Sequence, residues 1–165
     1  MAKPKSDAEK KGTKKGPRRD VVASHPRARF LFEILETFEA GIVLLGTEVK
    51  ALRAGKAQLQ EAYAKFRGTE LWLVKAHFPE YSHGGYMKHE PARSRKLLLH
   101  GHELAKINAK VTQKGLTLVP LSLYFNEKGL AKLELALARG RKLYDKREAI
   151  RSREARESMR RVSRR

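Results

Sequence analysis

The chain contains no cysteine, which excludes a disulfide framework and a thiolate zinc site. It contains no apolar run near the roughly 18 residues that a membrane-spanning helix needs. Its basic N-terminus is not followed by the apolar segment of a signal peptide, so we expect a cytoplasmic protein with no membrane partner. The length of 165 residues fits one domain with tails.

The chain also lacks the motifs of familiar catalytic sites. A phosphate-binding loop would need Ser or Thr after Gly55-Lys56, but Ala57 follows. A zinc-protease helix beginning at His102-Glu103 would need a second histidine where Lys106 stands. No Gly-x-Ser-x-Gly turn occurs. We therefore predict that the protein is not an enzyme and uses neither a cofactor nor a metal.

Two weaker alternatives for a chemical site stay open. A metal pair at His100 and His102 is disfavoured, because side chains two positions apart point to different sides of a helix. A carboxylate pair could form if Glu33 and Glu39 shared a strand face, but the basic charge of the chain offers no reason for it.

Acidic residues are scarce, with 18 Asp and Glu against 37 Lys and Arg and a formal net charge of +19. The excess lies mainly at the two ends of the chain. Residues 1–29 hold ten cationic and three acidic residues, and residues 139–165 hold twelve and four. This distribution predicts a polyanionic partner, and nucleic acid is the first candidate.

Residues 1–24 form the first of three predicted segments. Up to about Asp20 they are rich in Lys, Pro, Gly and Ser and have almost no large apolar side chain. Such a segment cannot offset its ordering entropy by burial, so we expect a disordered basic arm. A solubilising arm without a specific partner is an equal alternative.

Residues 140–165 form a basic C-terminal tail. From Asp145 onward the tail has no Gly or Pro, and helix formers dominate it. Its sizeable apolar residues are only Ile150, Met159 and Val162, too few to dock on a core. We expect repulsion between arginines to keep the tail unfolded until a polyanion neutralises it, whereupon it becomes helical. The alternative is a solvated basic tail.

Residues 25–139 have the pattern of a folded domain. Alternating and apolar runs predict strands over 30–38, 42–45, 62–67, 70–78, 116–125 and 130–138. Helices are predicted over 48–53, with Thr47 as the cap, and over 101–114, with a long loop at 79–96. A mainly β protein with short helices fits an OB-fold-like small β-barrel, which has no free strand edges. Trp72 has apolar neighbours and is predicted in the core.

Five runs resemble one family, the SsrA-binding protein (SmpB) family, which partners transfer-messenger RNA in bacterial ribosome rescue. They occur in the family's order: Ile34–Ile42, Gly46–Ala57, Arg95–His100, Lys114–Leu121 and Gly140–Arg147. The resemblance covers the chain from about His25 to the C-terminus. It implies a barrel that grips the tRNA-like domain of transfer-messenger RNA and a protein that delivers this RNA to stalled ribosomes for trans-translation.

The resemblance also implies individual RNA-binding residues. Positions that the family uses against the tRNA-like domain match Glu39, Leu98 and His100. A family Asn near the entry of the barrel falls at His25, which departs from the pattern but can still hydrogen-bond RNA.

Four cations of the predicted long loop are further candidates for RNA-backbone contacts, although a solvated basic loop has equal weight: Lys88, Arg93, Arg95 and Lys96.

The tail also has a role implied by the resemblance. In the family it enters the decoding centre of the small ribosomal subunit and the empty mRNA path, and folds to a helix there. The matching residues are Gly140, Arg141, Lys142, Tyr144, Asp145, Lys146 and Arg147. Tyr144 could stack on a decoding base. The alternative function is that of a ribosomal protein or general translation factor with an OB-type barrel.

Overall fold

Helices and strands follow one another in an order close to that expected from the sequence pattern. The computed structural model describes residues 20–55, 57–81, 88–112 and 115–162. In this part of the chain the strands are β1 (Asp20–Ser24), β2 (Phe32–Ile42), β3 (Tyr63–Arg67), β4 (Glu70–Val74), β5 (Arg95–Leu98), β6 (Leu116–Phe125) and β7 (Ala131–Gly140). The helices are α1 (Ala28–Leu31), α2 (Gly46–Arg53), α3 (Gly101–Val111) and α4 (Leu143–Val162).

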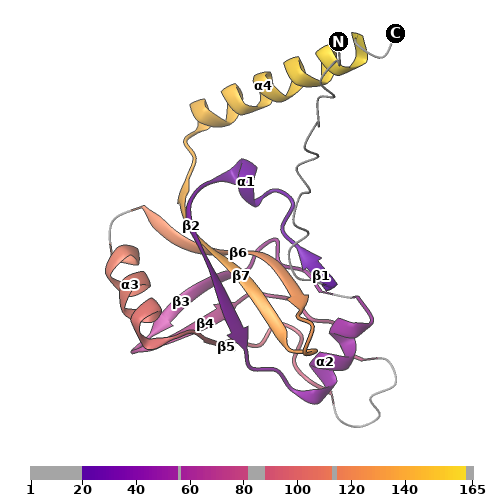
Figure 1. Ribbon diagram of the computed structural model, residues 1–165, viewed down its shortest axis with the longest axis vertical. Coiled ribbons are helices and arrows are strands. Elements are labelled where there is room, and N and C mark those ends of the chain that lie inside the picture. The colour runs from indigo at the N-terminus through magenta and orange to yellow at the C-terminus, as the bar shows by residue number, and fades with distance from the viewer. Residues whose placement is uncertain (1–19, 56, 82–87, 113–114, 163–165) are drawn as a thin grey trace, which may run out of the picture.

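The sheet closes on itself. Its strand order is β1-β6-β3-β4-β5-β2-β7, and a further pairing of β6 with β7 completes a ring of antiparallel neighbours. Strand β1 pairs with β6 outside this ring. Figure 1 shows the strands wrapped into a barrel with α2 and α3 on different sides of it. The predicted small β-barrel with short helices is therefore confirmed.

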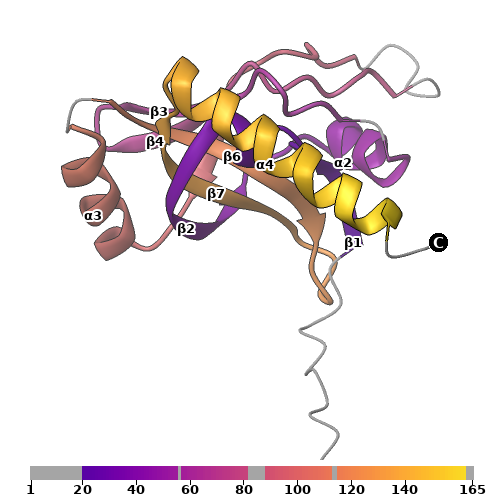
Figure 2. The same cartoon turned by 90° about the horizontal axis from the view of Figure 1, so that it is seen from above.

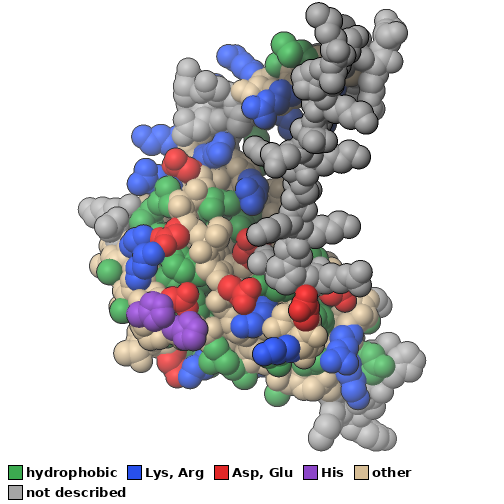
Figure 3. Space-filling model, viewed as in Figure 1, with side chains coloured by type: hydrophobic (Ala, Val, Ile, Leu, Met, Phe, Trp, Pro, Cys, Tyr) green, Lys and Arg blue, Asp and Glu red, His purple; other side chains and the backbone are tan. Residues whose placement is uncertain are grey.

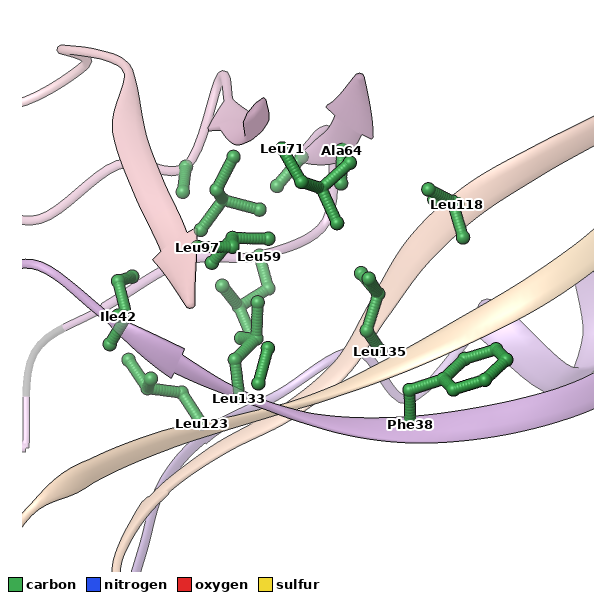
Figure 4. Close-up of a cluster of buried hydrophobic side chains, with 14 of the residues drawn as sticks. Phe38, Ile42, Leu59, Ala64, Leu71, Leu97, Leu118, Leu123, Leu133 and Leu135 are labelled. Atoms are coloured by element: carbon green, nitrogen blue, oxygen red, sulfur yellow. The ribbon is translucent and has the colours of Figure 1, made fainter. Parts of the chain in front are cut away.

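The core fills the interior of the barrel (Figure 4). Leu133, Leu135 and Leu137 alternate along β7 and are at most 1 % exposed, as the sequence pattern predicts. Strand β6 behaves differently, because its pairing with β7 shifts between Pro120 and Ser122. Such a shift reverses the faces on which side chains lie.

Regular alternation along residues 116–125 would place Val119, Leu121, Leu123 and Phe125 on one face, but the shift divides them between two. Leu123 and Phe125 belong to the barrel core. Val119 and Leu121 instead join a second cluster with Ala28 of α1.

Several predicted boundaries are also wrong. Residues 20–24 are strand β1 and not part of a disordered arm; residues 1–19 lie outside the described residues. The expected strand over 42–45 does not form, because β2 continues through Gly41 to Ile42 and the chain then leads into α2.

Other differences concern β4, β5 and the cap of α2. Strand β4 ends at Val74, and Lys75 takes a positive φ of 59° that breaks the extended backbone. The expected loop over 79–96 contains the start of β5. Leu45, not Thr47, is the N-cap of α2.

Helix α4 lies apart from the barrel. Figures 1 and 2 show it crossing above α1 and the sheet, joined to β7 by a short connection. The backbone N–H of Arg141 donates to the Leu31 carbonyl over 3.1 Å, which ties the start of this connection to α1. The tail is thus helical in this structure, while the dependence of its folding on RNA stays a prediction. In the described chain, no helix combines the length and apolar character that crossing a bilayer demands.

Candidate nucleic-acid interface

Three residues predicted to bind RNA meet at one pocket. Glu39 comes from β2, Leu98 ends β5 and His100 precedes α3. The pocket has a volume of about 400 Å³ and is lined by Glu39, Gly41, Ile42, Leu98, Leu99, His100, Glu103, Leu130, Ala131 and Lys132. It combines apolar walls with a few convergent polar groups, which is the usual make-up of a ligand site.

Strand pairing explains why distant residues converge at this pocket. Gly41 of β2 faces Leu98 of β5 on one side and Lys132 of β7 on the other. A Cβ added at Gly41 would lie 3.3 Å from the Leu98 Cβ, so the missing side chain leaves room for Leu98. The pocket therefore lies over the backbone of Gly41, which has no side chain, between β5 and β7.

The polar groups of the pocket are held in place. The Tyr124 hydroxyl donates a hydrogen bond to Glu39, and the Lys132 ammonium lies 3.5 Å from the Glu39 carboxylate. The Glu39 side chain is nevertheless 50 % exposed. The backbone N–H of His100 donates to the Glu103 carboxylate over 3.1 Å. Glu39 thus remains accessible as an acceptor beside a cation.

Histidine rings and apolar side chains stand at the same surface. The His100 ring is exposed and stacks on His102 with centroids 5.6 Å apart. Leu98 and Leu130 are 52 % and 56 % exposed. An exposed apolar pair beside polar groups is a frequent mark of an interaction site.

Leu130, Lys132 and Gly41 were not among the predicted site residues. Their contribution depends on the pairing of β2 with β7, which the sequence pattern alone does not give. A partial signal was available, since Lys132 lies on the outward side of an alternating strand.

His25 does not reach this pocket. Its backbone N–H donates to the Leu121 carbonyl over 2.8 Å, and the residue is only 6 % exposed. Burial lowers the pKa of His25, and a hydrogen bond with the Pro120 backbone partly opposes that shift. Its Nδ1 atom is buried with no hydrogen-bond partner in the described structure. The ring of His25 is thus enclosed and lies away from the pocket of Glu39, and its contact with RNA stays a prediction.

Arg95 is also wrongly predicted as an RNA-backbone contact, because it is fully buried. Its guanidinium donates to Glu48 over 2.8 Å and to the carbonyls of Ala76 and Pro91. Arg93, with a side chain 26 % exposed, binds the same carboxylate. The two arginines thus link Ala76, Pro91 and the start of β5 to Glu48 of α2.

The charge of Glu48 is stabilised by this cluster. Its burial raises the pKa of the carboxyl, but the hydrogen bonds from Arg93 and the Leu45 N–H, with the two arginine charges, bring the pKa below its ordinary value. Arg95 also lies over the Phe78 ring at 3.9 Å. The cluster is a structural brace in which the arginine donors are occupied.

Lys88 and Lys96 remain at the surface. Lys88 is 69 % exposed and lies 3.3 Å from Glu80, while Lys96 forms an ion pair with Glu70. The surface position of both is compatible with the predicted RNA contacts. Neither lines the pocket of Glu39.

The tail contributes a second, cationic cleft. Its lining residues are Arg29, Arg141, Ser152, Arg153, Arg156, Met159 and Arg160, around a volume of about 1030 Å³. Among the predicted tail residues, Gly140 ends β7, Arg141 lines the cleft, and Lys142 and Arg147 are exposed. The side chains of Tyr144, Asp145 and Lys146 lie outside the described residues.

Comparisons with known proteins support the family resemblance found in the sequence. A family model described as "SmpB protein" matches residues 22–165. An SsrA-binding protein of Agrobacterium fabrum is 54% identical over 134 residues, covering 81% of this chain and 84% of the relative. One of Sphingopyxis alaskensis is 51% identical over 154 residues, covering 93% and 92%.

A solved structure is similar to this chain as well. It is described as "tmRNA-SmpB: a journey to the center of the bacterial ribosome", with a TM-score of 0.65 and 53% identity. The match covers 78% of this chain and 94% of the solved chain.

Proposed function

The chain belongs to the SmpB family, and we propose that it binds the tRNA-like domain of transfer-messenger RNA and delivers it to stalled ribosomes for trans-translation. The observation that carries this proposal is the pocket at which Glu39, Leu98 and His100 meet. These residues lie far apart in the sequence, and the barrel brings them to one surface.

The barrel binds the RNA mainly through shape. The tRNA-like domain lacks a codon-reading stem, and a protein body of this size fills the missing volume. Glu39 accepts a hydrogen bond from a base amino group or a ribose 2′-hydroxyl, and His100 binds beside it. Lys88 and Lys96 add contacts to RNA phosphates, which become weaker as the salt concentration rises.

The C-terminal tail monitors the ribosome. It enters the decoding centre and the mRNA path of the small subunit when messenger is absent, and its arginines bind ribosomal RNA. The predicted residues are Gly140, Arg141, Lys142, Tyr144, Asp145, Lys146 and Arg147. The cationic cleft beside α1 supports this role, because a cleft lined by arginines favours a polyanion.

The protein acts as a binding module of the bacterial cytoplasm and has no catalytic role of its own. The relatives are named for binding SsrA, which favours a binding role over a catalytic one. The runner-up, a ribosomal protein or general translation factor with the same kind of barrel, predicts ribosome binding without transfer-messenger RNA.

The test is a competition experiment with the full chain. Labelled tRNA-like-domain RNA is bound to the protein and displaced by unlabelled RNA of the same sequence or by ordinary transfer RNA. We expect a clear preference for the tRNA-like domain. Equal displacement by ordinary transfer RNA contradicts the proposal. Capture of bulk ribosomal RNA alone from a lysate would instead support the runner-up.

Variants test the pocket itself. Glu39→Ala and His100→Ala should each weaken RNA binding about 10- to 100-fold, as expected for the loss of a hydrogen bond to a charged group or of a stacked ring. Glu33→Ala, which removes an exposed glutamate of the same strand, serves as the matched control. If the site variants instead lose their circular-dichroism spectrum, the residues are structural.

A further inference from the structure

The outer surface of β3, β4 and β5 carries the only tryptophan of the chain. Trp72 was predicted in the core, but it lies between Leu71 and Leu73, which are fully buried and occupy the inner face of β4. Side chains alternate along a strand, so the indole of Trp72 is on the outer face and is partly exposed. The core prediction for Trp72 is therefore wrong.

Cations flank this tryptophan on both sides. In the strand pairing Trp72 faces Lys65 of β3 and Lys96 of β5. Lys65 is exposed, and Lys96 is partly exposed. One row across three strands thus consists of a cation, an aromatic ring and a second cation. Proteins that bind single-stranded nucleic acid use such cations for the phosphates and such rings for base stacking.

Arg67 completes the surface. Its guanidinium carbon lies 5.2 Å from the centre of the Trp72 ring, and one of its nitrogens donates to the Ser94 hydroxyl over 2.9 Å. Both contacts fix the orientation of an exposed arginine. A guanidinium held in place loses less conformational entropy when it binds a phosphate or stacks on a base.

Glu70 is the carboxylate of this surface, and it is matched by a cation. Hydrogen bonds from Lys96 and, to a lesser degree, from the Trp72 ring lower the pKa of Glu70. Glu70 is thus paired with Lys96 beside the indole of Trp72. Lys65 and Arg67 give the surface its excess of positive charge.

The surface continues into the pocket described above. Lys96 and Leu98 are two positions apart on β5 and lie on the same outer face, and Leu98 lines the pocket with Glu39. The Trp72 row and the pocket therefore lie on the same outer surface, with β5 contributing a residue to each. In Figure 3 cationic and acidic side chains are interspersed over the visible face of the barrel, so charge alone does not single out a surface.

We propose that this row, Lys65–Arg67–Trp72–Lys96, is a second contact surface for the RNA that occupies the pocket. An unpaired base stacks at the Arg67–Trp72 pair, and Lys65 binds an adjacent phosphate. Lys96 exchanges its ion pair with Glu70 for a phosphate on the other side. The inference rests on the proposed function, because it takes the tRNA-like domain as the ligand. It adds three residues to the predicted site, Lys65, Arg67 and Trp72, and gives the outward-facing tryptophan a role.

The single tryptophan allows a direct test with the full chain. Titration with tRNA-like-domain RNA should change the emission of Trp72 with the same midpoint as binding measured by RNA anisotropy. Trp72→Ala should weaken binding roughly 5- to 150-fold, the range for the loss of one base–aromatic stack. Trp72→Phe keeps a ring and should lose less, while the midpoint of thermal unfolding reports whether either variant is folded.

Charge variants separate phosphate contacts from stacking. A plot of log affinity against log salt concentration has a negative slope, and Lys65→Ala should make that slope shallower by about 0.7 to 0.9. Arg67→Met keeps an apolar cover on the indole but removes the cation, so affinity should fall and Trp72 emission should still respond. Lys128→Ala, at the exposed turn between β6 and β7, is the matched control and should change neither quantity.

The outcomes are distinguishable. If RNA binds without changing Trp72 emission, and Arg67→Met and Trp72→Phe bind like the wild type, the second surface is overturned while the pocket is unaffected. If emission responds only to small ribosomal subunits, the surface faces ribosomal RNA and its assignment to the tRNA-like domain is wrong. If the wild type does not prefer the tRNA-like domain over transfer RNA, the proposed function itself fails.

Discussion

The barrel and helix α4 are held in place by different forces. The barrel encloses a core of leucines and a buried ion cluster, in which Glu48 and Arg95 are both fully buried. In α4 the described apolar side chains lie open, with Ile150 at 43 % and Met159 at 73 % exposure. Packing of buried side chains therefore holds the barrel in shape, whereas the position of α4 depends mainly on its charged side chains.

This difference indicates a division of labour between recognition and sensing. A rigid body suits an RNA whose shape is fixed, because its surface is preorganised. A cationic helix with few tertiary contacts suits a site that is only sometimes vacant, because its position responds to the anions around it. Figure 1 shows α4 outside the barrel, above α1.

The largest effect is expected from removing the tail. Deletion of residues 145–165 should abolish peptide tagging on stalled ribosomes and leave binding of the tRNA-like domain largely intact. The reason is that the pocket lies entirely on the barrel and α3 side of the molecule. Tagging is measured in a reconstituted translation reaction, and RNA binding by anisotropy. A truncated protein that still supports tagging would refute the division of labour.

The next largest effect is expected from the brace of the barrel. Glu48→Ala leaves Arg95 buried without its partner, which should reduce the free energy of unfolding by about 3–5 kcal/mol. Urea denaturation measures the loss. Glu61→Ala, which removes an exposed glutamate, should stay within about 0.5 kcal/mol of the wild type. A loss of similar size in both variants would show that the buried Glu48–Arg95 pair contributes no more to stability than an exposed glutamate does.

Acid should weaken the same brace. The pKa of Glu48 in the folded protein is below its ordinary value of 4.5, so its contribution is complete above pH 4.5 and is lost as the pH falls through the lower folded value. The free energy of unfolding should therefore decline on acidification below about pH 4.5. Glu48→Gln should show a shallower decline over the same interval, which a series of urea titrations checks. Parallel curves would exclude Glu48 as the titrating group.

The smallest effect concerns single arginines of α4. Arg156 lines the cationic cleft and Arg151 on the same helix does not. Arg156→Ala should reduce the salt dependence of binding to small ribosomal subunits by about 0.7 to 0.9 in the log–log slope, and Arg151→Ala should reduce it less. Equal effects of both substitutions would mean that the tail acts as a diffuse cation rather than through its cleft.

The sequence predicted best those elements whose pattern is local. The alternation of leucines identified the strand over 130–138, which the structure has as β7. The runs 62–67 and 70–78 flank Gly68, which takes a φ of 62° in the turn between β3 and β4. Strands β1 and β5 were missed because each is short and gains its partners from distant parts of the chain. Neither pairing leaves a periodic signal within the strand itself.

The candidate site divides in the same way. Three of the residues implied by family resemblance, Glu39, Leu98 and His100, meet at one pocket, whereas His25 lies elsewhere. Charge alone misplaced Arg95, because its partner Glu48 lies 47 positions earlier in the chain. A cation in a basic loop and a cation in a buried pair look alike until the fold brings the carboxylate to it.

Strand β7 has one more consequence. Ala131 and Lys132, at its beginning, border the pocket, and Gly140, at its end, leads into α4. Ten extended residues span about 30 Å, and pairing with both β2 and β6 stiffens them along that length. Strand β7 therefore fixes the distance between the pocket and the start of α4, so that binding of RNA at the pocket also sets where α4 begins.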